Sequence, residues 1–219
     1  MVVREKFEND LRSVQEQFIA LSKLSISTLD KSITALLNQD VDIALSIIQN
    51  DKYINRMEEE INDRVILLLA KQQPVATDLR RLIVMIKAAH DMERVGDYAV
   101  NIAKETIRVG KTELVYPIRN IEQMRDKTIV MLEQVMLAFT EENVEKAREI
   151  AALDDQVDSL YGETIQQLLS VGAEHPDKLS QITQLSFVCR YLERSADHAT
   201  NIAEQLFYLV KGRHYDLNN

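Results

Sequence analysis

The sequence predicts an all-α protein whose six long helices form two similar three-helix bundles. Only five Gly and three Pro occur among the 219 residues, which leaves few turns and favours long helices. Apolar residues recur every three or four positions along most of the chain, as they do on the buried face of a helix. A polar motif of the first half also returns in the second half, which indicates a repeated unit.

Five breaks in this periodicity separate the six predicted helices. They lie at residues 38–40, 73–74, 110–117, 140–142 and 172–176. Asp40 and Thr140 are residue types that cap helix N-termini, whereas Pro74 and Pro176 stand where a helix can begin. The middle break is the predicted boundary between two halves of three helices each, residues 1–112 and 113–219.

Composition excludes several classes of function. The net charge of −9 disfavours direct contact with nucleic acid or anionic lipid, and a single Cys fits a reducing compartment. We find no apolar run of about 18 residues, and the N-terminus is charged within its first six residues, so we expect a cytoplasmic protein without membrane insertion. The sequence contains no glycine-rich phosphate loop and no G-x-S-x-G motif, so we do not expect an enzyme.

The internal duplication is the strongest signal in the sequence. Residues 93–103 match residues 193–203 at an offset of 100, with seven of the eleven positions identical. A weaker match links residues 51–57 with residues 154–160. Shared buried positions would explain the matching Ala and Ile, but not the matching Glu, Arg, Asp and Asn. The two halves are therefore predicted to be copies of one three-helix unit.

The repeated acidic residues are predicted to meet at two equivalent places. Acids four residues apart share one face of a helix. In each half, one polar pair lies on the helix before the predicted turn and an acidic pair lies on the helix after it, at the same distance from the turn in sequence. The turn is centred on Pro74 in the first half and at His175–Pro176 in the second. The candidate residues are Asp51, Glu93 and Asp97 in the first half, and Asp154, Asp158, Glu193 and Asp197 in the second.

Two interpretations of these acids remain open at this point. Clustered carboxylates repel one another, and their oxygens suit hard cations such as Mg, Ca, Mn or Fe. The alternative is a solvated helix face on which Arg94 and Arg194 form ordinary ion pairs with Asp97 and Asp197. The sequence has no His-rich or Cys-rich set to favour structural zinc. Asn55 stands where the second half has Asp158, so the first site is the less complete one.

Three further residues are of types that can carry function. Cys189 falls on an apolar helix face and is expected to be a buried small hydrophobe. His90 and His198 flank the acids, but they are not at equivalent positions of the repeat. We expect both histidines to have surface roles.

Taken together, the motifs resemble those of the PhoU family of phosphate-uptake regulators. The resemblance rests on residues 73–80 (QPVATDLR), on the repeated 93–103 and 193–203 motifs, and on the acidic segments at 51–58 and 154–160. It implies two three-helix bundles whose Glu/Asp-x-x-x-Asp motifs bind metal, with iron the first expectation and Mg, Mn, Ca or Zn as alternatives. It further implies that the seven acids named above are the ligands, and Asn55 departs from the acidic pattern of the first site.

The resemblance also implies a function and partners. Such proteins hold the phosphate-starvation response off when phosphate is plentiful. The implied partners are the ATPase subunit of a phosphate ABC transporter and a phosphate-sensing histidine kinase, and a homodimer is expected. Our main hypothesis is therefore a metal-binding regulatory adaptor. The alternatives are a metal-storage or metal-dependent hydrolytic protein that uses the same acids, and a plain structural bundle.

Overall fold

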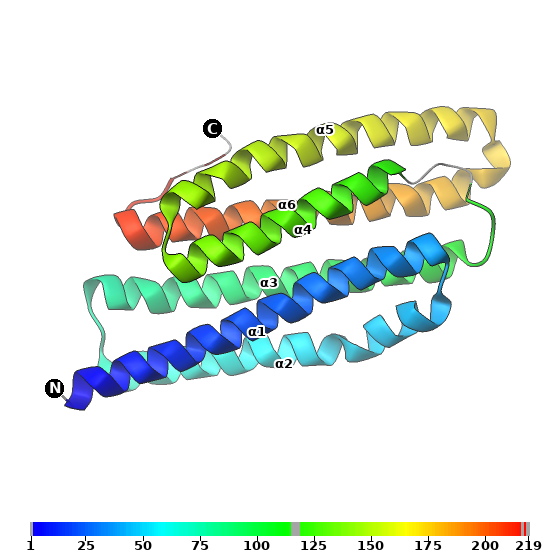
Figure 1. The fold of residues 1–219 in the computed structure, drawn as a ribbon. Helices are drawn as coiled ribbons and strands as arrows, with labels where there is room; N and C mark the ends of the chain where they lie inside the picture. Colours follow the sequence, from blue (N-terminus) through cyan, green and yellow to red (C-terminus); the bar gives the residue numbers. More distant parts are fainter. Residues whose placement is uncertain (1, 115–118, 216, 218–219) are drawn as a thin grey trace.

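The computed structural model describes residues 2–114, 119–215 and 217, and it confirms the predicted fold class. Within these residues the chain forms six long α-helices and one short 3₁₀ helix, arranged as two three-helix bundles (Figure 1). The first bundle consists of α1 (Val2–Asn38), α2 (Val41–Gln72) and α3 (Ala76–Val109). The second consists of α4 (Arg119–Glu141), α5 (Val144–Glu174) and α6 (Leu179–Lys211), with the 3₁₀ helix η1 (Pro176–Lys178) before α6.

The predicted breaks coincide with helix ends, although part of the third break, residues 115–117, lies outside the described residues. Asp40 caps α2 as predicted, because its carboxylate accepts a hydrogen bond from the Ile43 amide at 2.9 Å. The prediction that Thr140 caps a helix is wrong. Thr140 still lies in the last turn of α4, where its hydroxyl donates to the Met136 carbonyl, and Asn143 caps α5 instead.

Helices α3 and α6 form the centre of the molecule and hold the two bundles together (Figure 1). They run antiparallel, because Arg80 near the start of α3 donates to the Leu209 carbonyl near the end of α6. At the middle of the contact, the rings of Tyr98 and Tyr191 stack with centroids 5.9 Å apart. The main apolar core runs through both bundles, and a smaller apolar cluster lies within the first bundle alone.

The contact between α3 and α6 has an approximate twofold axis. By the offset of 100, position 91 is equivalent to 191 and position 98 to 198. Asp91 contacts His198 at 2.7 Å, and Tyr98 stacks on Tyr191, so the two contacts occupy equivalent places. The same packing position is therefore filled by a hydrogen-bonded Asp–His pair on one side of the axis and by two aromatic rings on the other.

Candidate functional site: two carboxylate clusters

The first cluster lies between α2 and α3, where the sequence predicted it. Burial is the main cause that raises the pKa of Asp51 on α2, and the Asp97 carboxylate on α3 is the second. Burial likewise raises the pKa of Glu93, again with Asp97 as the next cause. The helix pair therefore brings the Asp97 carboxylate close enough to Asp51 and to Glu93 to disfavour the charged form of both.

Several oxygen atoms of this cluster lack a hydrogen-bond partner among the described residues. They are Asp51 Oδ1, Asn55 Oδ1 and Glu93 Oε2, all of which are buried. Asp97 is different, because Arg94 donates to its Oδ2 at 2.5 Å. Buried oxygens without a hydrogen-bond partner are unfavourable in a structural core, and they are suitable ligands for a cation.

The second cluster lies between α5 and α6 and is the more strongly perturbed. The pKa of Glu193 is raised to about 7, mainly by burial and then by the Asp197 carboxylate, although Arg190 opposes the shift. The pKa of Asp158 on α5 is raised by burial and then by Asp197. Asp154 lies one turn before Asp158 and is buried, with 4% of its surface exposed. Acids of both helices therefore interact, as the hairpin register predicted.

Two residues beside the first cluster were not predicted as part of it. The Nδ1 atom of His90 lies 3.9 Å from the nearest carboxylate oxygen of both Glu58 and Glu93. Glu58 and His90 are equidistant from Pro74 in the sequence, as are the predicted pairs, so the same register argument would have found them. In the second half their equivalents are Tyr161 and Arg190, which form a cation–π contact at 5.8 Å.

The expected surface role of His198 is wrong, whereas that of His90 agrees with its exposed side chain. Only 17% of the His198 side chain is exposed, because it pairs with Asp91 and lies against the Tyr98 ring at the centre of the α3–α6 contact. Cys189 is fully buried as predicted, and burial raises the pKa of its thiol to about 12. It is therefore an inert packing residue.

The donor atoms fit a hard cation in chemistry but do not yet form a coordination sphere. Within the described residues, no three His, Cys, Asp or Glu side chains come close enough together to hold a metal ion. Arg94 and Arg190 each neutralise one acid of their cluster, Asp97 and Glu193 respectively. Metal binding would therefore require side-chain rotation that draws the carboxylates together. No described helix combines the length and the hydropathy of a membrane-spanning segment.

The chain is similar in sequence to known proteins of one family. A family model described as the PhoU domain matches residues 18–106 and again residues 121–206, once in each predicted half. A Clostridium acetobutylicum protein named "Phosphate-specific transport system accessory protein PhoU homolog" is 37% identical over 219 residues, which is the full length of both chains. The Escherichia coli (strain K12) protein named "Phosphate-specific transport system accessory protein PhoU" is 31% identical, over 96% of this chain and 87% of its own.

Two solved structures have the same fold along nearly their whole length. The phosphate transport system regulatory protein PhoU of Streptococcus pneumoniae superposes with a TM-score of 0.89 at 30% identity, covering 96% of this chain and 99% of its own. PhoU of Pseudomonas aeruginosa also has a TM-score of 0.89 at 30% identity, covering 94% of this chain and all of its own.

Proposed function

The chain belongs to the PhoU family, and on that premise we propose that it is an adaptor that holds the phosphate-starvation response off when phosphate is plentiful. The family consists of regulatory accessory proteins rather than enzymes, so the hydrolytic alternative is not retained. We propose two partners, the ATPase subunit of a phosphate ABC transporter and a phosphate-sensing histidine kinase. The names of its relatives, which refer to the phosphate-specific transport system, support the first of these.

The two carboxylate clusters are the observation that supports a metal-dependent adaptor. They occupy equivalent positions in the two repeats, and both contain carboxyl groups with raised pKa values. The proposed ligands are Asp51, Glu93 and Asp97 in the first cluster, and Asp154, Asp158, Glu193 and Asp197 in the second. We propose iron, or else Mg, Mn, Ca or Zn, because carboxylate oxygens accept all of these.

The residues of each cluster suggest how loading could affect a partner surface. A bound cation would supply the positive charge that the crowded carboxylates lack. Glu193 would then lose its proton, and Asp158 on α5 and Asp197 on α6 would be drawn together rather than repelled. The α5–α6 face would become stiffer, and the α2–α3 face likewise, which offers partners two metal-dependent surfaces.

The remaining proposals concern assembly. We propose a homodimer, because six long helices leave extended faces exposed to solvent. We also propose residues 1–112 and 113–219 as the two units, with the boundary in the connection between α3 and α4. These units share the main apolar core, which supports the proposal that they are units of the repeat rather than independently folding domains.

The test compares variants in cells that lack the native gene. A reporter of the phosphate-starvation response is measured in abundant phosphate, with the wild type, with Glu193→Ala/Asp197→Ala, and with Glu59→Ala/Asp63→Ala. The last pair has the same spacing on α2, but both residues are exposed and lie outside the clusters, so it is the matched control. We expect repression by the wild type and the control, and loss of repression in the cluster variant.

Each outcome addresses a separate part of the proposal. If the deletion itself leaves the reporter repressed, the regulatory role is wrong. If the cluster variant represses as fully as the control, the adaptor does not depend on the second cluster. Affinity purification of the tagged wild type, with mass spectrometry, should recover the transporter ATPase or the sensor kinase. Recovery of neither from complemented cells would contradict the proposed partners.

A further inference from the structure

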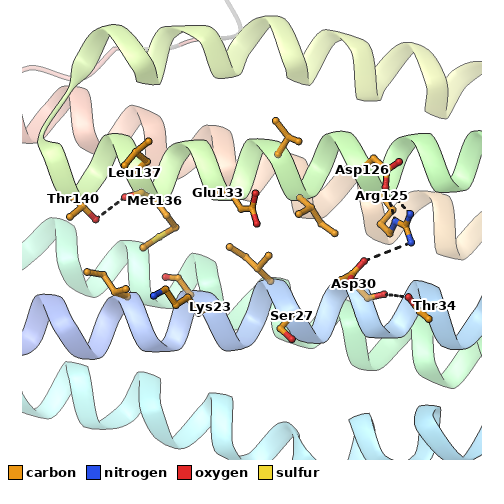
Figure 2. A pocket seen from close by; sticks show the side chains of 15 residues that line it. Lys23, Ser27, Asp30, Thr34, Arg125, Asp126, Glu133, Met136, Leu137 and Thr140 are labelled. Carbon is orange, nitrogen blue, oxygen red and sulfur yellow. Dashed lines mark hydrogen bonds and ion pairs between the residues drawn. The ribbon is translucent and has the colours of Figure 1, made fainter.

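A groove lies between α1 and α4, on helices that carry none of the candidate metal ligands (Figure 2). The two helices run antiparallel, and two contacts bridge them. Near one end, the Phe18 and Phe139 rings pack with centroids 5.0 Å apart, and at the other, Arg125 lies 3.7 Å from the Asp30 carboxylate. Between these bridges the groove encloses about 1060 Å³ and is lined by side chains from both helices.

The walls of the groove are mainly apolar. The apolar lining residues are Ile19, Ile26, Ile129, Val130, Met136 and Leu137. Leu137 is 49% exposed and Val130 is 40% exposed, and both line the α4 side of the groove. The lining extends over about 15 residues of each helix, or about 22 Å at 1.5 Å per residue. That length matches about four turns of one additional helix.

The edges of the groove carry charges that favour one orientation of a bound helix. Asp126 and Glu133 lie along the α4 edge, seven residues and thus about two helical turns apart. Lys23 lies on the α1 edge. Within the described part of the chain, neither Glu133 nor Lys23 has an ion-pair partner within 4.0 Å, and Asp126 pairs only with the adjacent Arg125. Among the described residues, the α4 edge therefore presents one unpaired carboxylate, Glu133, and one exposed carboxylate, Asp126, that already pairs with Arg125.

From these features we propose that the α1–α4 groove binds one amphipathic helix of a partner protein. Its apolar stripe would lie along the groove, and two Lys or Arg residues seven positions apart would meet Asp126 and Glu133. Helices commonly bind in apolar grooves through residues at i, i+3, i+4 and i+7, with charged flanks that select the orientation.

A second copy of this chain is a poorer occupant. If two copies met at this face, their two grooves would lie opposite each other and neither would fill the other. Outside the groove, the large apolar side chains exposed in the described residues include four around the α2–α3 turn, Ile66, Leu67, Val75 and Leu79, and single residues such as Tyr53, Leu169 and Phe187. None of these sets forms a continuous stripe over four turns of one helix. A folded copy thus offers no helix face that fills the groove. The proposal is also independent of the metal-dependent function, because the groove shares no residue with the carboxylate clusters.

The test uses a defined helical peptide and the full-length protein. The probe is a fluorescent, end-blocked peptide of about 18 residues, long enough for the four turns, with one Leu stripe and two Lys residues seven apart on one flank. A second peptide has Glu in place of the two Lys. Binding is measured by fluorescence anisotropy for the wild type, for Val130→Asp/Leu137→Asp, and for Leu169→Asp, whose exposed Leu on α5 is the matched control.

We expect the Lys peptide to bind the wild type and the control with similar affinity. Its Kd for the groove variant should be about tenfold higher or more, because buried apolar anchors carry most of the binding energy. Glu133→Lys should weaken the Lys peptide and strengthen the Glu peptide, which a merely damaged fold would not do. Failure of the wild type to bind the Lys peptide, or equal binding by the groove variant, would overturn the proposal. So would sedimentation showing that Val130→Asp/Leu137→Asp dissociates a dimer, since the groove would then be a contact between copies.

Discussion

At the scale of single residues, Glu193 shows how burial conflicts with charge. Its pKa is raised from 4.5 to about 7. A carboxyl with a raised folded-state pKa favours folding in its protonated form, so this contribution is complete below about pH 4.5 and is lost as the pH rises through about 7. Above about pH 7 the metal-free protein therefore carries a charge at Glu193 that opposes folding.

We predict that Glu193→Gln stabilises the metal-free protein at pH 8 by about 1–3 kcal/mol, because the amide resembles the protonated acid and leaves no buried charge. At pH 4 the variant and the wild type should be equally stable. Urea denaturation in the presence of a chelator measures both. The exposed Glu163→Gln on α5 is the control and should change little at either pH. A stability difference that is the same at pH 4 and pH 8 would contradict the assigned cause.

Site residues could be predicted where their distance in sequence from the helix–helix turn brings them level with residues on the neighbouring helix. Four-residue spacing and the turn at Pro74 were enough to bring Asp51 beside Asp97. Glu58 and His90 obey the same register, but neither is part of the repeated motif, so Glu58 was not a candidate and His90 was assigned a surface role. The size of the Glu193 pKa shift could not be predicted, because it depends on how deeply neighbouring side chains bury the carboxyl.

At the scale of helix pairs, the two repeats solve the same packing problem with different residues. A Cβ atom added at Gly96 on α3 would lie 2.8 Å from Ile54 Cδ1 and 3.0 Å from Ile54 Cγ2 on α2. The equivalent positions in the second half are Ala196 on α6 and Val157 on α5. A larger residue on one helix thus accompanies a smaller residue on the other.

We predict that Gly96→Ala destabilises the protein by about 1 kcal/mol, because overpacking against Ile54 outweighs the gain in helix propensity. In the Ile54→Val background, which removes Cδ1, the same substitution should be neutral or stabilising. Thermal or urea unfolding of the four proteins of this double-mutant cycle gives the coupling energy. Additive effects of the two substitutions would show that the contact does not limit the size of residue 96.

Helix capping shows how the repeat could have corrected the sequence prediction. Asp40 and Asn143 stand 103 positions apart, the same offset that relates Asp51 to Asp154. Each cap follows a residue with φ of 51°, Gln39 in one turn and Glu142 in the other. Thr140 is also a capping residue type, so composition alone could not choose between it and Asn143. The repeat register would have chosen Asn143.

We predict that Asn143→Ala lowers the free energy of unfolding by about 1 kcal/mol, because the amides of Glu145 and Lys146 lose their acceptor. Thr140→Val should have less than half of this effect, since the Thr140 hydroxyl only donates to a carbonyl of its own helix. Urea denaturation measures both variants. A larger loss for Thr140→Val would contradict the assignment of the cap.

At the scale of the whole molecule, the approximate twofold symmetry makes the differences between the halves informative. The fold class and the pairing of helices were predictable, because periodicity and duplication act on many residues at once. The chemistry at equivalent positions was not, since Asp91 and Tyr191 fill related places with different contacts. In the same way, His90 beside the first cluster is replaced by Arg190 beside the second. The two clusters are therefore expected to differ in metal affinity.

We predict that the second cluster binds metal more tightly, because Asp158 provides a charge that Asn55 does not. Titration of the metal-free protein with Mn²⁺, followed by electron paramagnetic resonance, should resolve a tighter and a weaker class of sites. Asn55→Asp should tighten the weaker class by about tenfold, and Asp158→Asn should weaken the tighter class by a similar factor, since carboxylate count sets affinity for hard cations. Glu59→Gln, on an exposed part of α2, is the control. If Asn55→Asp leaves both classes unchanged, residue 55 is not a ligand position.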